Sequence, residues 1–389
     1  MNLLLISIDS LRFDYVSRTN AAVATPRFDA LTEHFNFYPH CFSVSSATRP
    51  VHTSVFTGLY PFEHGVLGQN YARMRPGLPH LFNLFRQKNY AVGAFSEADI
   101  VFEGLDYAPY IQPLPVYAPE SRQIVQRFLF DHRGQAQCLF LHYWCAHTPY
   151  GAADNQAYGE TARLLFGDGR SEVLGRYRRA VIDLFEFKLA PLFEILDLST
   201  WCVVLFGDHG ESWTEEEPYH GQTLRNAVLR VPLYLHVPHT GNPALAQSVL
   251  SLIDLFPTLV SLFGLPVNYR GFGSDLFSDR CNLPYLAQIH ALPLRDDLNA
   301  LGAPATGGLK WALFDAVEKF TYDEALQQGK LEHTLSEEPT ENEGDQTRFL
   351  NSYAQLQKRS HYTLGWAAAV DGPGDDILLN KRLEQLGYL

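Results

Sequence analysis

The sequence predicts an α/β fold built on a large, mostly parallel sheet that helices cover on both faces. Apolar residues fall into short runs of strand length, and amphipathic stretches of helical length separate these runs. Strands that alternate with helices in this way are typical of crossover units, which join parallel strands. The composition agrees, because 46% of the 389 residues are apolar and can form a substantial core.

Four apolar runs are the predicted strands of this sheet. The first, residues 3–8, is apolar at nearly every position, as expected for a strand that is covered on both faces. Three later runs repeat the pattern, at residues 90–95, 138–144 and 201–206. The predicted helices between them include residues 78–89 and the long stretch 171–196.

A short helix is predicted at residues 50–57. Pro50 suits its first position and Gly58 suits the position just past its end. Thr48 or Arg49 is therefore expected at the mouth of this helix, where unpaired N–H groups and the helix dipole favour an ionised hydroxyl or a bound anion. The alternative interpretation is that Thr48 is a plain N-cap.

The C-terminal part of the chain predicts a smaller unit. Residues 280–300 are rich in turn formers, so we expect a large domain over residues 1–285 and a small α+β subdomain over residues 286–389. Within the subdomain, residues 310–323 alternate well enough for a pair of strands. The acidic tract 336–345 is interpreted as a solvated loop.

Charge and cysteine content exclude several classes of function. Lys and Arg total 30 against 43 Asp and Glu, a net charge of −13, so nucleic acid is not an expected partner. No apolar run is long enough to span a bilayer, and the first residues resemble a buried strand rather than a signal peptide. The five scattered cysteines indicate reduced thiols and hence a cytoplasmic location.

Polar residues follow two of the predicted strands directly. Asp9 and Ser10 come after the first strand, and Asp208 and His209 come after the run 201–206 and a glycine. In parallel sheets, ligands bind beyond the carboxyl ends of the strands. Two carboxylates and an imidazole suit a divalent cation such as Mg, Mn, Zn or Ca. The alternative is that both aspartates only cap turns or the helices that follow.

Seven motifs occur in order along the chain: LLLISIDSLRFD, FTGLYPFEHGV, FLHYWCAHTPY, VVLFGDHGE, LRVPLYLHVP, SLIDLFPTLVSLFGLP and the closing RLEQLGYL. In this order they resemble the sulfatase and alkaline-phosphatase superfamily. The resemblance implies an alkaline-phosphatase-like sandwich with a small C-terminal sheet domain, and members of the superfamily cleave sulfate or phosphate esters with a metal-activated nucleophile.

Within this resemblance, two residues compete for the nucleophile position. The stretch SSATR resembles the signature by which serine-type sulfatases have their serine oxidised to formylglycine, and that alignment selects Ser45. Sulfatases place the modified residue nine positions before the threonine that ends the nucleophile helix. Counting back from Thr57 selects Thr48 instead, with Pro50 in the proline position and His52 where an arginine would stand. We therefore expect Thr48 to be the nucleophile, and it cannot become formylglycine by the usual route.

The resemblance assigns phosphoryl chemistry to an unmodified threonine. Such nucleophiles are associated in the superfamily with phosphodiesterases and with phosphoglycerol or phosphoethanolamine transferases. We expect a small-molecule phosphodiester or phosphonate-type monoester to be cleaved by in-line attack of Thr48. The alternatives are a sulfuric ester hydrolase and a non-catalytic binding protein with the same fold.

One divalent ion is expected, and its predicted ligands are Asp9, Thr48, Asp208 and His209. Arg49 and His52, on the same helix as Thr48, are expected to meet charge on the ester; the alternative for Arg49 is a solvated or salt-bridged residue. Matched motif positions imply that His147 protonates the leaving group and that His220 approaches the substrate, and Asn70, one residue farther along than in relatives, is expected to bind it. Relatives often carry a second acidic residue where this chain has Ser10. Structural roles are expected for His142, His64 and His236.

Overall fold

The fold is centred on an eight-stranded sheet in the order β4-β3-β5-β1-β6-β7-β2-β8. It is seen in a computed structural model of the chain, which describes residues 1–69, 73–116, 119–151, 158–214, 217–240, 249–278, 284–292, 307–340 and 346–361. Of the eight strands, β7 runs against the others, so the sheet is mostly parallel as predicted. The strands are β1 (Asn2–Ile8), β2 (Asn36–Phe42), β3 (Ala91–Ser96), β4 (Ile111–Pro113), β5 (Gln137–Tyr143), β6 (Trp201–Gly207), β7 (Arg230–His236) and β8 (Leu250–Ser251).

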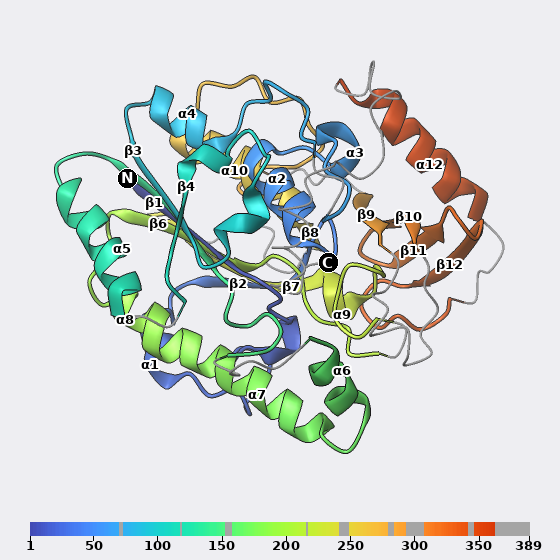
Figure 1. Ribbon diagram of the computed structural model, residues 1–389. Helices are drawn as coiled ribbons and strands as arrows, with labels where there is room; N and C mark the ends of the chain where they lie inside the picture. Colours follow the sequence, from blue (N-terminus) through green and yellow to red (C-terminus); the bar gives the residue numbers. More distant parts are fainter. Residues whose placement is uncertain are drawn as a thin grey trace.

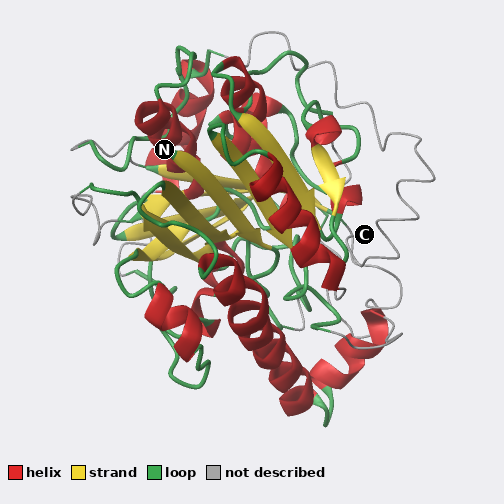
Figure 2. Ribbon diagram, turned by 90° about the vertical axis from the view of Figure 1, so that its left-hand side faces the viewer, coloured by secondary structure: helices red, strands yellow, loops and turns green. Residues whose placement is uncertain are grey.

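Helices cover both faces of this sheet (Figures 1 and 2). Alternate residues of β1 point to opposite faces, so Leu3 and Leu5 pack with one core while Leu4 and Ile6 pack with the other. The first core includes residues of α2 (Thr48–Thr57), α3 (Pro61–His64), α4 (Leu81–Gln87), α9 (Asn226–Leu229) and α10 (Leu255–Phe263). The second includes residues of α1 (Pro26–Leu31), α5 (Pro119–Asp131), α6 (Tyr158–Phe166), α7 (Arg170–Asp183) and α8 (Ala190–Phe193).

The long stretch predicted at residues 171–196 is helical but not uniform. A π-helical segment, Leu184–Leu189, joins α7 to α8. Short 3₁₀ turns lie elsewhere, at Phe13–Tyr15, Asp99–Phe102, Ala108–Tyr110 and Leu252–Asp254.

A second sheet of four antiparallel strands lies beside the large one, in the order β12-β11-β10-β9. Its strands are β9 (Tyr285–Ala291), β10 (Gly308–Phe314), β11 (Glu318–Asp323) and β12 (Gln328–His333), and α12 (Gln346–Arg359) packs on it. The pair β10 and β11 confirms the strand pair predicted at residues 310–323. Trp311 stacks on Tyr353 of α12, with ring centroids 4.2 Å apart.

Helix α2 begins earlier than the sequence predicted. It starts at Thr48, with Ala47 as its N-cap, so Pro50 occupies the third helical position rather than the first. Proline is tolerated there because the first turn of a helix has no partners for its N–H groups. Gly58 ends the helix in the left-handed conformation, with φ of 72°, as expected.

Four of the cysteines, Cys41, Cys138, Cys145 and Cys202, are free and buried, whereas Cys281 lies outside the described residues. None of the helices within the described ranges combines the length and apolar composition that crossing a bilayer requires.

Candidate active site

Asp9 and Asp208 lie side by side because the strands that precede them are neighbours. β1 and β6 pair in parallel, and the register places Ile8 opposite Gly207. The N–H of Asp208 donates to the carbonyl of Ile8 over 3.2 Å, which continues the pairing one residue past the strands. Both carboxylates are fully buried. The two acidic groups therefore meet at the carboxyl edge of the sheet.

Thr48 reaches this pair from the first residue of α2. Its Oγ1 lies 3.3 Å from Oδ2 of Asp9 and 3.3 Å from Nε2 of His209. The backbone N–H groups of the first helical turn lack partners within the helix, and they form the positive end of its dipole. Since Ala47 is the N-cap, the interpretation of Thr48 as a plain N-cap is wrong.

His209 presents an unprotonated nitrogen to the carboxylates. Its Nδ1 lies 3.1 Å from the carbonyl oxygen of Gly210, and a carbonyl can only accept, so the proton is on Nδ1. Nε2 lies 3.7 Å from Oδ1 of Asp9 and 3.6 Å from Oδ2 of Asp208. This is the tautomer that a metal-ligating histidine needs.

Burial raises the pKa of both carboxyl groups, but neighbouring charges shift the two pKa values in opposite directions. For Asp208, burial and the adjacent charge of Asp9 raise the pKa well above its usual value. For Asp9, burial alone would raise the pKa, but His147, His142 and His209 together hold it well below its usual value. Oδ2 of Asp208 is buried and accepts no hydrogen bond from any of the described residues. Two carboxylates this close are expensive to ionise together without a cation between them.

The residues present therefore fit a divalent cation. Asp9, Asp208 and His209 each offer a ligand atom, and these atoms lie within 4.8 Å of one another. Two carboxylate oxygens, an imidazole nitrogen and the Thr48 hydroxyl form a donor set that suits Mg, Mn, Zn or Ca.

Ser10 gives this cluster hydrogen bonds rather than a further charge. Its N–H donates to Oδ1 of Asp208 over 3.0 Å and its hydroxyl donates to Oδ1 of Asp9 over 3.0 Å. The hydroxyl of Tyr177 donates to the Ser10 carbonyl over 2.7 Å and holds the turn in place. Ser10 thus orients both carboxylates.

His142 belongs to the cluster, although the sequence predicted only a structural role for it. Its Nε2 lies 3.5 Å from Oδ2 of Asp9, and its Nδ1 lies 2.7 Å from Oγ of Ser96. β5 pairs with β1 in parallel and places His142 opposite Ser7. The signal available in the sequence was a histidine near the end of an apolar strand, the same pattern that singled out Asp9.

His147 and His220 lie next to the cluster, beside His209. The His220 ring centroid lies 4.3 Å from that of His209 and 5.0 Å from that of His147. Nδ1 of His220 lies 3.0 Å from Oε1 of Glu211, which the sequence analysis did not assign, and Nδ1 of His147 lies 2.8 Å from the carbonyl of Thr148. Burial lowers the pKa of His147 to about 4 and that of His220 well below its usual value. Both rings are therefore neutral near pH 7 in the absence of a bound anion.

Arg49 and His52 are directed into the protein. The guanidinium of Arg49 donates to the carbonyls of Val101 and Glu103, each over 2.6 Å. His52 lies 2.8 Å from the Thr48 carbonyl through Nδ1 and 2.8 Å from Oγ of Ser7 through Nε2. Burial and the nearby His142 lower the pKa of His52 to about 3. The Arg49 guanidinium thus donates to backbone carbonyls rather than facing the cluster, contrary to the sequence-based expectation. His52 borders the cluster, because its Nδ1 lies 3.9 Å from Oδ2 of Asp208.

The remaining candidates are Ser45 and Asn70. The Oγ atom of Ser45 is buried and has no hydrogen-bond partner among the described residues. Ser45 precedes α2, whereas Thr48 is its first residue. Asn70, predicted to bind substrate, lies outside the described residues.

A sequence model of the Sulfatase family matches residues 1–265 of this chain. The chain belongs to the sulfatase family. This confirms the resemblance that its motifs indicated, and members of the family use a divalent metal ion. Among curated relatives, arylsulfatase K of Mus musculus is 32% identical over 80 residues and that of Homo sapiens is 30% identical over 80 residues. These alignments cover 20% of this chain and 14% and 15% of the relatives, so the chain matches only a small part of their length.

Solved structures share the fold of this sulfatase-family chain over nearly its whole length. A phosphonate monoester hydrolase from Silicibacter pomeroyi has a TM-score of 0.70 at 15% identity and covers 94% of this chain and 96% of its own. The phosphonate monoester hydrolase of Agrobacterium radiobacter has a TM-score of 0.68 at 16% identity, with 91% and 94% covered. A 2-O GAG sulfatase has a TM-score of 0.67 at 12% identity, with 92% and 91% covered. At these identities the likeness shows the fold alone.

Proposed function

We propose that this sulfatase-family chain is a metal-dependent hydrolase that cleaves a phosphodiester or phosphonate-type monoester by in-line attack of Thr48. The observation that carries the proposal is the position of the Thr48 hydroxyl, at the N-terminus of α2 and 3.3 Å from both Asp9 and His209. Asp9, Asp208, His209 and Thr48 would hold one divalent ion. When bound, such an ion lowers the pKa of a coordinated hydroxyl.

In this proposal, helix α2, His147 and His220 each have a separate role in the reaction. The positive end of the α2 dipole favours negative charge on the nonbridging oxygens of an ester at Thr48, while the Arg49 N–H donates to Oε1 of Gln69 over 3.3 Å. His147 carries a proton to the leaving group at Nε2, because its Nδ1 is used by the Thr148 carbonyl. The negative charge of a bound ester raises the pKa of His147 back toward neutral, so the ring becomes protonated when substrate is present. Glu211 orients His220 toward the same ester.

Arg49 and His52 act in this proposal as positioning residues. His52 joins the first turn of α2 to Ser7 on β1, and Arg49 fixes the same turn against residues 101–103. Together they set the distance between Thr48 and Asp9. Asn70 remains a substrate-binding residue on the ground of its sequence position. A small-molecule ester as partner and a cytoplasmic location also remain proposals that rest on the sequence.

Two structural neighbours support phosphoryl chemistry, while the Sulfatase family model, arylsulfatase K and a 2-O GAG sulfatase support a second candidate. Phosphonate monoester hydrolases stand among the structures with the same fold. A 2-O GAG sulfatase has it too, and the Ser45 hydroxyl is buried next to the nucleophile helix. Sulfate ester hydrolysis is therefore the second candidate.

The test is peptide mass analysis and metal analysis of the purified protein, with hydrolysis of aryl sulfate, aryl phosphate, aryl phosphodiester and aryl phosphonate by wild type, Thr48→Ala and Ser45→Ala. We expect an unmodified chain, about one bound divalent ion, and phosphoester turnover that falls at least about 10³-fold in Thr48→Ala but persists in Ser45→Ala. Formylglycine at Ser45, with sulfate cleavage that survives the loss of Thr48, would establish the second candidate. A metal-loaded protein that turns over none of the esters would indicate a binding protein.

A further inference from the structure

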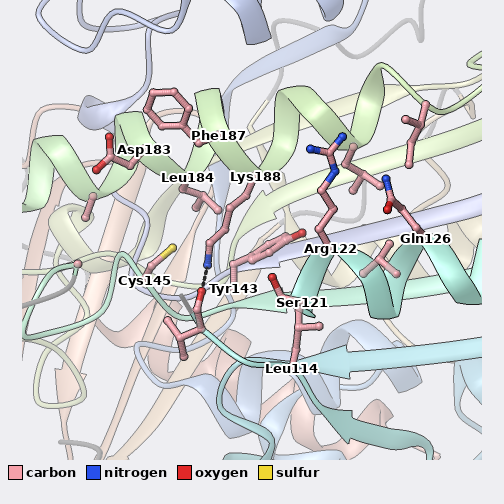
Figure 3. A pocket seen from close by; sticks show the side chains of 16 residues that line it. Leu114, Ser121, Arg122, Gln126, Tyr143, Cys145, Asp183, Leu184, Phe187 and Lys188 are labelled. Atoms are coloured by element: carbon pink, nitrogen blue, oxygen red, sulfur yellow. Dashed lines mark hydrogen bonds between the residues drawn. The ribbon is translucent and has the colours of Figure 1, made fainter. Parts of the chain in front are cut away.

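A pocket of about 590 Å³ lies between α5 and the helical segment around Leu184 (Figure 3), and none of its lining residues belongs to the carboxylate cluster. Several of its apolar residues, such as Leu114, Val125 and Leu184, pack in the core that contains α7 and α8, whereas α2 packs in the core on the other face of the sheet. Pockets of 300–1,000 Å³ commonly hold small organic ligands. The pocket is therefore large enough for a ligand of its own.

Large aliphatic side chains are the most frequent kind in the walls of this pocket, beside the aromatic Tyr143 and Phe187 and the thiol of Cys145. The aliphatic residues are Leu114, Val116, Val125, Leu184, Leu192 and Ile195. Flexible, branched side chains of this kind follow the contour of a hydrocarbon chain, and each methylene that leaves water contributes to binding. A ligand that fills the pocket is expected to be predominantly aliphatic.

The charged groups at the pocket are mostly cationic. Arg122 rises from the first turn of α5 and Lys188 reaches down from the opposite helical segment, while Asp183 lies toward the far end (Figure 3). Lys188 pairs with the buried Glu97 and donates to the Val116 carbonyl, so its charge is already balanced. Because Glu97 balances Lys188 and Asp183 lies toward the far end, Arg122 is the charged group that favours an anionic head group at its own end of the pocket.

The helical segment that forms one wall has two unusual features. It is π-helical over Leu184–Leu189, a geometry often found at functional sites. At the pocket, Phe187 is 70% exposed and Ile195 is 45% exposed. Apolar side chains at the rim of an apolar pocket lose this contact with water when a hydrophobic ligand covers them.

We propose that this pocket binds an unbranched aliphatic chain with a single anionic head group, with the chain among the aliphatic walls and the head group near Arg122. Long-chain carboxylates and alkyl sulfates share this chemistry. The proposal does not depend on the reaction at Thr48, because the pocket and the carboxylate cluster involve different residues.

Calorimetric titration of the metal-loaded chain tests the proposal, with inorganic phosphate present to occupy the ester site and with ligands below their micelle concentrations. From octanoate to decanoate to dodecanoate, affinity should rise about fourfold per methylene. Decanol and decyltrimethylammonium should bind more weakly than decanoate. Comparison of decanoate with decyl sulfate then decides between the two sources of the head group.

Substitutions in and near the pocket test whether decanoate binds there. Ala180→Phe places a ring in the pocket and should weaken decanoate binding at least about tenfold. Arg122→Gln should weaken decanoate about two- to fivefold and leave decanol unchanged. The matched control is Arg127→Gln, since Arg127 lies on the same helix with its side chain 83% exposed and does not line the pocket.

Three results would overturn the proposal: no dependence on chain length, unchanged decanoate binding in a folded Ala180→Phe protein, or a preference for the cationic amphiphile. If Ala180→Phe does not fold, two measurements decide whether the pocket binds the ligand: the dependence of wild-type affinity on chain length, and the comparison of decanoate binding by Arg122→Gln with that by Arg127→Gln.

Discussion

Oγ1 of Thr48 lies 3.3 Å from Oδ2 of Asp9, although the two residues are 39 positions apart in the chain. The distance is set by the end of β1 and the start of α2, which His52 ties together through Ser7. A side chain that lacks the hydroxyl but keeps the shape of threonine therefore isolates the role of this oxygen.

Thr48→Val is expected to fold normally and to lose ester hydrolysis by at least about 10³-fold, because it replaces Oγ1 with a methyl group of similar size. Thr48→Ser keeps the hydroxyl and should retain measurable turnover. Steady-state kinetics with the preferred aryl ester, alongside thermal melting, checks both. Turnover by Thr48→Val at the wild-type rate would remove Thr48 from the mechanism.

Asp208→Asn is expected to stabilise the metal-free protein. The substitution replaces a buried carboxyl, whose ionisation both burial and the adjacent Asp9 oppose, with a neutral amide, so the folded state no longer bears the cost of ionising this position. A divalent ion should raise the melting temperature of the wild type, because ligands that bind the folded state stabilise it, and this rise should be much smaller in the variant. Differential scanning calorimetry with chelator or with excess Mn, Zn, Mg or Ca measures both effects. An equal ion-induced rise in the two proteins would contradict the assignment of Asp208 as a ligand.

His142→Gln is expected to weaken divalent-ion binding about 10–100-fold, the usual effect of losing a group that orients a metal ligand. The reason is the 3.5 Å approach of His142 Nε2 to Oδ2 of Asp9. His64→Gln is the matched control, since His64 is equally buried but contacts Ser54 and the Val66 N–H instead. Competition titration with a chromogenic chelator gives the affinities. The same loss in both variants would point to a general effect of destabilisation.

The predictions from the sequence agree with the structure where they depend only on which segments are strands and on the sheet being mostly parallel. Apolar runs identified β1 and β6, and carboxyl ends of parallel strands share one edge of a sheet, so Asp9 and Asp208 could be expected to meet there. His142 was missed because its place opposite Ser7 depends on the register of β5 against β1, which hydrophobic periodicity does not give.

The direction in which side chains point was the other feature that the sequence could not predict. The sequence places Arg49 at the mouth of α2, but its guanidinium turns toward carbonyls of residues 101–103, a loop about 50 positions away in the chain. The pairing of His220 with Glu211 likewise depends on the path of the loop between them. Contacts of this kind come from tertiary packing, and no local pattern encodes them.

Glu63 makes the stability of the protein depend on pH. Burial raises the pKa of the Glu63 carboxyl from its ordinary value of 4.5 to about 7, while hydrogen bonds from the Ser360 hydroxyl and the Tyr60 N–H limit the rise. Below pH 4.5 the group is protonated in both the folded and unfolded states. As the pH rises toward 7 the unfolded chain releases its proton first, so the free energy of unfolding falls by about 3 kcal/mol.

Glu63→Gln should remove this loss, and Ser360→Ala should enlarge it, because the Ser360 hydroxyl stabilises the ionised form. Urea denaturation at pH 4.5 and pH 8 gives the difference for each protein. If wild type and Glu63→Gln lose the same stability between the two pH values, Glu63 does not have the raised pKa.

Gly58→Ala is expected to destabilise the protein much more than Gly77→Ala. Both glycines have positive φ, 72° and 75°, so alanine costs about 1–2 kcal/mol at either position. At Gly58 the added Cβ would also lie 2.6 Å from both Cδ1 of Phe256 and Cε2 of Tyr269, which adds about 1–3 kcal/mol of overpacking.

At Gly77, by contrast, no atom of the part of the chain that the structure describes lies within 4 Å of an added Cβ. Chemical denaturation of the two variants therefore separates the packing contribution from the backbone contribution. Equal losses of stability would mean that the end of α2 can shift away from Phe256. In that case the position of Thr48 would be fixed by the contacts of Arg49 and His52 at the start of the helix rather than by packing at its end.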